Sequence, residues 1–213
     1  MKLVVVVQHH PARTDLLPRL LERLDDPLLV VDPGGEKSSA WRTYRLALRA
    51  DVEDATHLLV VQDDATVCDH FPEAAAAAVE ARPAAAVAFF LSPQCRRTCV
   101  NATIAMRARK PWADWNRADF WPTVASAYPV PVARQLADWV DGRGTEPRGD
   151  DAPAGDFFRA HPTIKALVTV PSLVEHPDDT PSLIGRKHMA GKNPARCAKW
   201  PIGDRDPRKI TWD

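Results

Sequence analysis

Two adjacent carboxylates, Asp63 and Asp64, directly follow the apolar run HLLVVQ at residues 57–62. The run has the composition of a buried strand, so the acidic pair is expected at the carboxyl end of that strand, where open parallel sheets bind their ligands. Neighbouring carboxylates repel each other unless a cation or an arginine neutralises them. A few oxygen ligands suit Mg²⁺ or Mn²⁺ bridged to a diphosphate. The alternative is a solvated turn in which Asp64 caps the next helix.

A second acidic cluster, Asp150, Asp151 and Asp156, lies in RGDDAPAGDFF. Asp151 stands where a helix is expected to begin, and a carboxylate there can simply cap the helix and interact with its dipole. The same carboxylate can also act as a general base that removes a proton from an acceptor hydroxyl. Taken alone, the cluster favours the cap.

A third cluster begins at His176 and continues into a basic, proline-broken tail. A single histidine is more often an ordinary surface or core residue than a ligand. The cations that follow can fold over phosphate groups or can form no more than a solvated tail. They are Arg186, Lys187, His188, Lys192 and Arg196.

The elements that must position these clusters alternate in type along the first half of the chain. Strands are expected where β-branched and aliphatic residues run together, and helices where apolar residues recur at helical spacing. The strands are 3–7, 28–31, 57–62 and 84–91, and the helices between them are 14–24, 38–48 and 71–81. This order predicts an α/β domain with a mostly parallel sheet that carries helices on both faces.

The second half is less regular and richer in proline. A strand is expected at 99–106, a helix at 132–140, a short helix around Phe157 and Phe158, and a last strand at 165–170. We expect one domain over residues 1–184, and a basic C-terminal tail over residues 185–213.

Composition excludes several classes of protein. The 213 residues contain 28 Lys plus Arg and 28 Asp plus Glu, so a uniformly basic nucleic-acid-binding surface is excluded, although a local basic patch is not. The apolar runs are too short to span a bilayer, and the N-terminus is typical of a strand and not of a signal peptide. The four cysteines are expected to be free thiols in a cytoplasm, bacterial or phage-infected. Cys95 and Cys99 could supply half of a zinc site, but no second ligand pair follows.

The order and spacing of the three clusters add a resemblance. A strand ending in QDD, a later DD that opens a helix, and VPSLVEH at 170–176 together resemble a glycosyltransferase of the GT-A fold. The resemblance implies that Asp64, with Asp63, holds a divalent ion on the diphosphate of a nucleotide sugar, and that His176 completes this metal site. It also implies that Asp151, with Asp150 as its neighbour, is the base of an inverting reaction.

The resemblance extends to the donor site and covers residues 3 to about 200. VVVVQHHPAR resembles the strand and loop that seat the nucleoside, which implies donor contacts from His9, His10 and Arg13. DPGGEKSSAWRTYRLAL resembles the segment that closes over the nucleotide, which implies contacts from Trp41 and Arg42. In the tail, Lys187, Lys192 and Arg196 are expected to meet the phosphates.

The motifs depart from the family pattern in two ways. QDD is not a strict DxD, which leaves metal dependence open. The base motif is DD and not ED, which leaves the choice among Asp150, Asp151 and Asp156 open.

More narrowly, VPSLVEHPDDTPSL with QDDATVC resembles small phage and bacterial glycosyltransferases that are associated with hypermodified DNA bases. This implies transfer from a UDP-sugar, with Mn²⁺ or Mg²⁺, to 5-hydroxymethylcytosine in DNA. Two alternatives stay open: the same chemistry on a cell-surface saccharide or lipid, and an inactive nucleotide-sugar- or DNA-binding module.

Binding to DNA would require cations for the phosphates and flat surfaces for the bases. The chain offers the cations in two short segments, QCRRTC and RARKPW. Trp112, Trp115 and Trp121 are either stacking surfaces or core residues. The cations are Arg96, Arg97, Arg107, Arg109 and Lys110.

Overall fold

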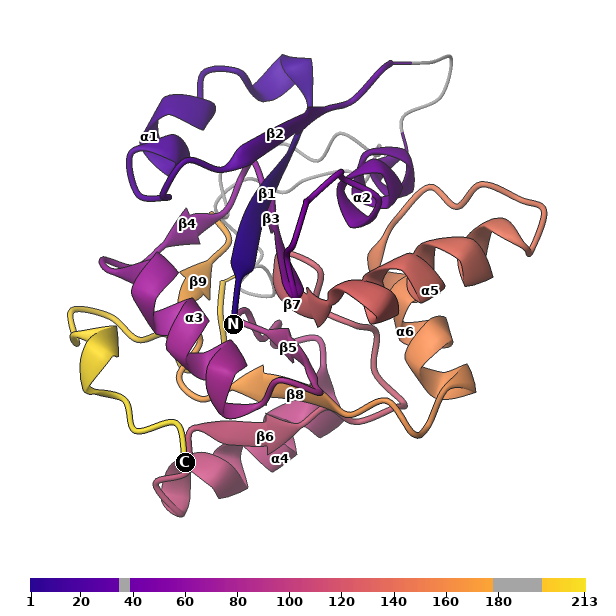
Figure 1. Cartoon of the computed structure of the whole chain (residues 1–213). Coiled ribbons are helices and arrows are strands. Elements are labelled where there is room, and N and C mark those ends of the chain that lie inside the picture. The colour runs from indigo at the N-terminus through magenta and orange to yellow at the C-terminus, as the bar shows by residue number, and fades with distance from the viewer. Residues whose placement is uncertain (35–38, 178–196) are drawn as a thin grey trace.

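The computed structural model describes residues 1–34, 39–177 and 197–213. Its centre is a seven-stranded sheet in the order β2-β1-β3-β7-β5-β8-β6 (Figure 1). These strands are β1 (Leu3–His9), β2 (Leu28–Val31), β3 (His57–Gln62), β5 (Ala86–Ala88), β6 (Trp112–Asp114), β7 (Ala125–Pro129) and β8 (Ala166–Thr169). Five of the seven run in one direction, and β6 and β7 are antiparallel to their neighbours. The predicted α/β fold with a mostly parallel sheet is confirmed.

Helices cover both faces of this sheet (Figure 1). On one face, α1 (Leu17–Leu21) and α3 (Phe71–Ala81) contribute to one core cluster. On the other face, α2 (Ala40–Leu48), α4 (Arg96–Arg107), α5 (Val130–Asp141) and α6 (Asp151–Ala160) contribute to a second.

The strands join the two clusters because successive side chains of a strand point to opposite faces. Val5 and Val7 of β1 lie in the first cluster, and Val6 lies in the second. In β3, Leu59 and Val61 face one way, and their neighbours face the other. The continuous apolar runs of the sequence therefore reflect strands that are buried on both sides.

Most elements of the first half match the prediction. Ser39 caps α2 by accepting a hydrogen bond from the Arg42 backbone amide at 3.2 Å. The helix predicted over 14–24 is shorter than expected: a 3-10 turn at Pro11–Arg13 precedes it, and α1 covers only Leu17–Leu21.

One prediction for the middle of the chain is wrong, and strands that the sequence did not predict occur there. Residues 99–106 are not a strand but part of α4, whose buried residues Thr98, Ala102 and Ala105 recur at helical spacing. The small strand β7 was not predicted, and it inserts antiparallel between β3 and β5. Its sequence ASAYP lacks the β-branched residues that mark β1, β2 and β3.

The described end of the tail packs against the domain. The Ile202 amide donates to the Ser172 carbonyl oxygen at 2.9 Å, and the rings of Trp212 and Trp112 lie 5.0 Å apart. Residues 197–213 are therefore not a solvated extension, and the predicted boundary at residue 185 falls outside the described residues.

Among the described helices, none combines the length and the apolar character that a transmembrane span requires. Cys68, Cys95 and Cys99 are free thiols, as expected.

Candidate functional site

The acidic pair lies at the carboxyl ends of β1 and β3. The Asp63 amide donates to the Gln8 carbonyl oxygen at 3.1 Å, which extends the pairing of β1 with β3 past the end of the strand. The Ala65 amide then closes a turn on the Gln62 carbonyl oxygen. Asp63 and Asp64 are only 4% and 3% exposed, so the prediction of their position is confirmed, whereas the alternative of a solvated turn is wrong.

Donors from the loop after β1 hold the carboxylate of Asp63. The His10 backbone amide donates to its Oδ2 at 2.7 Å, and His9 Nδ1 lies 3.1 Å from the same oxygen. Arg13 Nη1 donates to Oδ1 at 2.9 Å. The three residues predicted to seat the nucleoside thus contact Asp63, and their role in donor binding stays a prediction.

Asp64 joins two distant parts of the chain. Its Oδ2 lies 2.8 Å from Arg13 Nη1 and 3.2 Å from His176 Nε2. His176 reaches this position because β9 (Val174–Glu175) pairs with β4 (Thr66–Val67), just after the acidic pair. The structure therefore brings together the two residues predicted to be metal ligands.

Arg13 is the cation that neutralises the acidic pair, since a single Nη1 lies within 3 Å of an oxygen of each carboxylate. A divalent ion is not needed to explain why the two acids lie side by side. Among the residues that the structure describes, no three His, Cys, Asp or Glu side chains converge on a common metal position. An ion bound by Asp64 and His176 would have to take its other ligands from phosphates and water, and metal binding by these two residues stays a prediction.

Asp150 contacts side chains near the ends of the same two strands. Its Oδ2 accepts hydrogen bonds from Gln62 Nε2 at 3.0 Å and from Gln8 Nε2 at 3.5 Å. Gln8 and Gln62 are register partners, so one side chain can contact both. Burial, with a contribution from Asp151, raises the pKa of Asp150 to about 6, although Thr123 and Gln8 oppose the shift by donating hydrogen bonds.

The other two acids of the cluster have different surroundings. Asp151 lies in the first turn of α6, and its Oδ1 accepts from the Ala152 amide at 2.7 Å. Asp156 is on the surface of α6, where its carboxylate pairs with Arg143 and Arg159. Of the three, Asp150 is the one that contacts the ends of β1 and β3.

Asp32 belongs to the same sheet edge and was missed at the level of sequence. It follows β2, and its amide donates to the His9 carbonyl oxygen at 2.7 Å. Burial opposes its ionisation, yet hydrogen bonds from Thr43, the Gly34 amide and Arg42 leave the pKa of Asp32 below its usual value. Its position directly after an apolar run was the available signal, but the following proline and glycines suggested only a turn.

Several predicted contact residues have other surroundings. Arg42 binds Asp32, and Trp41 is fully buried in the core beside Tyr44. Because its ring is covered by protein, Trp41 offers no surface to a nucleotide in this conformation. Lys187, Lys192 and Arg196 lie outside the described residues.

The three tryptophans considered for base stacking are core residues. Trp121 is fully buried, Trp115 packs edge-on against it with ring centroids 5.7 Å apart, and Trp112 lies under the C-terminal segment. The alternative in which they stack on bases is therefore not supported.

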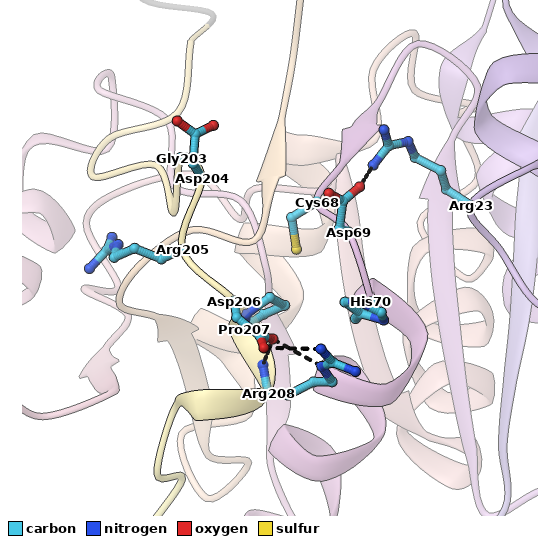
Figure 2. A pocket seen from close by; sticks show the side chains of 10 residues that line it. All are labelled: Arg23, Cys68, Asp69, His70, Gly203, Asp204, Arg205, Asp206, Pro207 and Arg208. Atoms are coloured by element: carbon cyan, nitrogen blue, oxygen red, sulfur yellow. Dashed lines mark hydrogen bonds and ion pairs between the residues drawn. The ribbon is translucent and has the colours of Figure 1, made fainter.

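A surface pocket of about 370 Å³ lies elsewhere, between the start of α3 and the C-terminal segment (Figure 2). Its lining mixes both charges: Arg23 pairs with Asp69, and Arg208 pairs with Asp206. The acidic pair and Asp150 are not part of this lining.

Comparisons with known proteins add little to this geometry. No protein-family model matches the chain, and no curated protein matches it either. Among solved structures, the chain is similar to mannose-1-phosphate geranyltransferase from Thermus thermophilus, with 16% identity, coverage of 79% of this chain and 74% of that chain, and a TM-score of 0.38. At this identity and TM-score, the function must be argued from the site itself.

Replacing Arg13 by glutamine should leave two buried carboxylates without their cation. We expect the free energy of unfolding to fall by about 3–5 kcal/mol near neutral pH, because breaking a buried ion pair exposes an uncompensated charge. Urea denaturation measures this loss, with Arg19→Gln on the exposed face of α1 as the control. A free energy of unfolding that Arg13→Gln leaves at the native value would contradict the interpretation.

The raised pKa of Asp150 predicts a pH-dependent stability. In the folded chain the carboxyl group of Asp150 has a pKa of about 6, whereas in the unfolded chain its pKa is the ordinary 3.8. The bound proton therefore stabilises the folded chain by about 3 kcal/mol at a pH below the unfolded pKa of 3.8. This stabilisation is lost as the pH rises through the folded pKa of about 6. Asp150→Asn keeps an oxygen for Gln62 and should abolish this part of the decline.

Unfolding midpoints measured between these two pH values test the prediction. Asp156→Asn, at a half-buried position on the outer side of α6, is the control and should retain the slope of the native chain. A slope that Asp150→Asn leaves unchanged would show that the carboxyl group of Asp150 titrates normally.

Proposed function

We propose that this chain is a nucleotide-sugar glycosyltransferase. The proposal is carried by the cluster of Asp63, Asp64 and His176 at the carboxyl ends of β1 and β3, together with the buried carboxyl group of Asp150, which contacts Gln8 and Gln62 near the ends of the same strands. This arrangement supplies acidic and imidazole groups suited to a cation–diphosphate unit, and a separate carboxylate with a pKa near the working pH.

On the donor side, Asp64 and His176 would hold Mn²⁺ or Mg²⁺, and the ion would neutralise charge on the departing diphosphate. Arg13 lies between the two carboxylates and would supply a further positive charge to the phosphates. Asp32, held by Arg42 and Thr43 at the end of β2, is placed to accept hydrogen bonds from a nucleoside. A UDP-sugar is the proposed donor.

On the acceptor side, Asp150 is the proposed general base. A base works best when its pKa lies near the operating pH, and burial gives Asp150 a pKa of about 6. Asp150 takes the proton of the acceptor hydroxyl as that oxygen bonds to the anomeric carbon, and the bond from this carbon to the diphosphate oxygen breaks. One displacement of this kind inverts the configuration. Gln8 and Gln62 orient the carboxylate.

The proposed acceptor is 5-hydroxymethylcytosine in DNA. Its support is the resemblance of the motifs to glycosyltransferases associated with hypermodified bases, together with the basic segments around α4. A base inside a duplex must leave the stack to reach a buried carboxylate, so this acceptor also implies base flipping.

Donor binding gives the first test. UDP-sugars with Mn²⁺ should raise the melting temperature of the native chain, because a ligand that binds only the folded state stabilises it. Asp64→Ala should abolish the shift, whereas Asp69→Ala, an exposed neighbour that pairs with Arg23, should retain it. A shift that survives Asp64→Ala would show that the donor binds elsewhere.

Sugar transfer gives the second test. Asp150→Asn should lower transfer of a labelled sugar to hydroxymethylcytosine DNA by at least about 100-fold, as expected for the loss of a general base, and should leave the donor-induced shift in place. Unmodified DNA should receive no sugar. Full activity of Asp150→Asn, with loss in Asp151→Asn, would move the base to the neighbouring residue.

A further inference from the structure

The helix α4 and the segment after it form an unusually basic part of a chain whose net charge is zero. Residues 92–113 contain no Asp or Glu, although the chain as a whole has 28 acidic and 28 basic residues. Five exposed cations stand at the two ends of the helix: Arg96, Arg97, Arg107, Arg109 and Lys110. Within the described part of the chain, none of them makes an ion pair.

Between these two groups of cations, one side of α4 is apolar and exposed. Val100 and Ile104 are 60% and 62% exposed and are one helical turn apart. With Arg97 before them and Arg107 after them, they form one stripe at steps of three, four and three residues, which share a helix face. This stripe, from Arg97 to Arg107, is called the α4 face below.

The opposite side of α4 is used by the core. Thr98, Ala102 and Ala105 are buried, and the Thr98 amide and hydroxyl both donate to Asp119 at 2.7 Å. Asn101 donates to the Asp114 carbonyl oxygen at 2.8 Å. The helix is thus fixed along its length, and the α4 face points away from the domain as a rigid surface.

We propose that the α4 face binds the backbone of double-stranded DNA, an inference that rests on the proposed DNA acceptor. A helix of 12 residues is about 18 Å long, so cations at its two ends can reach the strands on either side of a major groove about 12 Å wide. Four of the five cations are arginines, and one guanidinium group can donate two hydrogen bonds to the same phosphate group. Val100 and Ile104 lie between the cations, where they can contact thymine methyl groups.

The geometry fits DNA better than a membrane surface. A helix that binds at a bilayer buries its apolar side among the lipids and usually carries Trp, Phe or Leu there. In α4 the side with the small buried residues is already covered by the sheet, and the α4 face presents no aromatic ring. Charge complementarity with regularly spaced phosphates is the interaction that remains.

Equilibrium binding of an unmodified duplex tests the proposal without any sugar transfer. With a fluorescein-labelled duplex of about two helical turns, the variant Arg97→Ala/Arg107→Ala should bind at least about tenfold more weakly at low salt. The slope of log K against log salt should also fall by about 0.9 for each phosphate group that the variant no longer neutralises. Arg19→Ala/Lys209→Ala removes two exposed cations elsewhere and should bind like the native chain.

Two results would overturn the proposal. One is equal affinity and equal salt slope for the native chain and Arg97→Ala/Arg107→Ala. The other is binding to phosphatidylserine–phosphatidylcholine vesicles that depends on the same two arginines while the duplex is not bound, which would assign the α4 face to a membrane surface.

The outcome is separable from that of the proposed function. The thermal shift with UDP-sugars and Mn²⁺ should be the same in Arg97→Ala/Arg107→Ala as in the native chain, because the α4 face contributes nothing to the acidic pair. Loss of DNA binding in this variant, in a chain that shows no donor shift at all, would support the DNA surface and reject the glycosyltransferase. A donor-induced rise in melting temperature, together with DNA binding that the variant leaves unaltered, would support the glycosyltransferase and reject the DNA surface.

Discussion

The ion pair between Arg13 and the two buried carboxylates is the interaction on which the site depends. Asp63 and Asp64 are adjacent in the chain and almost fully buried, so their mutual repulsion must be met by a cation within the protein. Arg13 meets it with a single nitrogen between the two groups, at 2.9 and 2.8 Å. The loop after β1 is thereby tied to the end of β3, and the edge of the sheet exists as a preformed polar cluster.

The parallel register of β1, β2 and β3 explains why so many polar groups meet at this edge. Parallel strands end on the same side of a sheet, so the acids that follow β2 and β3 lie beside the two histidines at the end of β1. The short ladder of β4 with β9 then adds His176 from the far end of the domain. Together, these strand ends concentrate charged side chains at one edge of the sheet, beyond the last hydrogen bonds between the strands.

Asp150 shows how the same edge separates two kinds of carboxylate. The acidic pair faces cationic and imidazole groups, whereas Asp150 faces the neutral amides of Gln8 and Gln62 and is largely desolvated. Amide donors stabilise the charge less than a guanidinium does, so burial prevails and the pKa rises. Carboxylates in different environments suit different tasks, which is the basis for the proposal that the acidic pair serves the donor and Asp150 the acceptor.

The sequence by itself determined the α/β class, the strands that carry the acidic pair, the serine cap of α2 and the clustering of acids and histidines at strand ends. These features depend on local periodicity and on the identity of neighbouring residues. Only the tertiary structure decided that Arg13 neutralises the pair, and that Asp150 and not Asp156 faces the strand ends. It also decided that Asp32 joins the site. Residues 99–106 proved to be helical, with both arginine segments flanking one exposed face. It also placed Trp41, Trp115 and Trp121 in the core. These outcomes depend on strand order, register and burial, which are set by contacts between residues far apart in the chain, and local patterns do not encode which distant partner a side chain will meet.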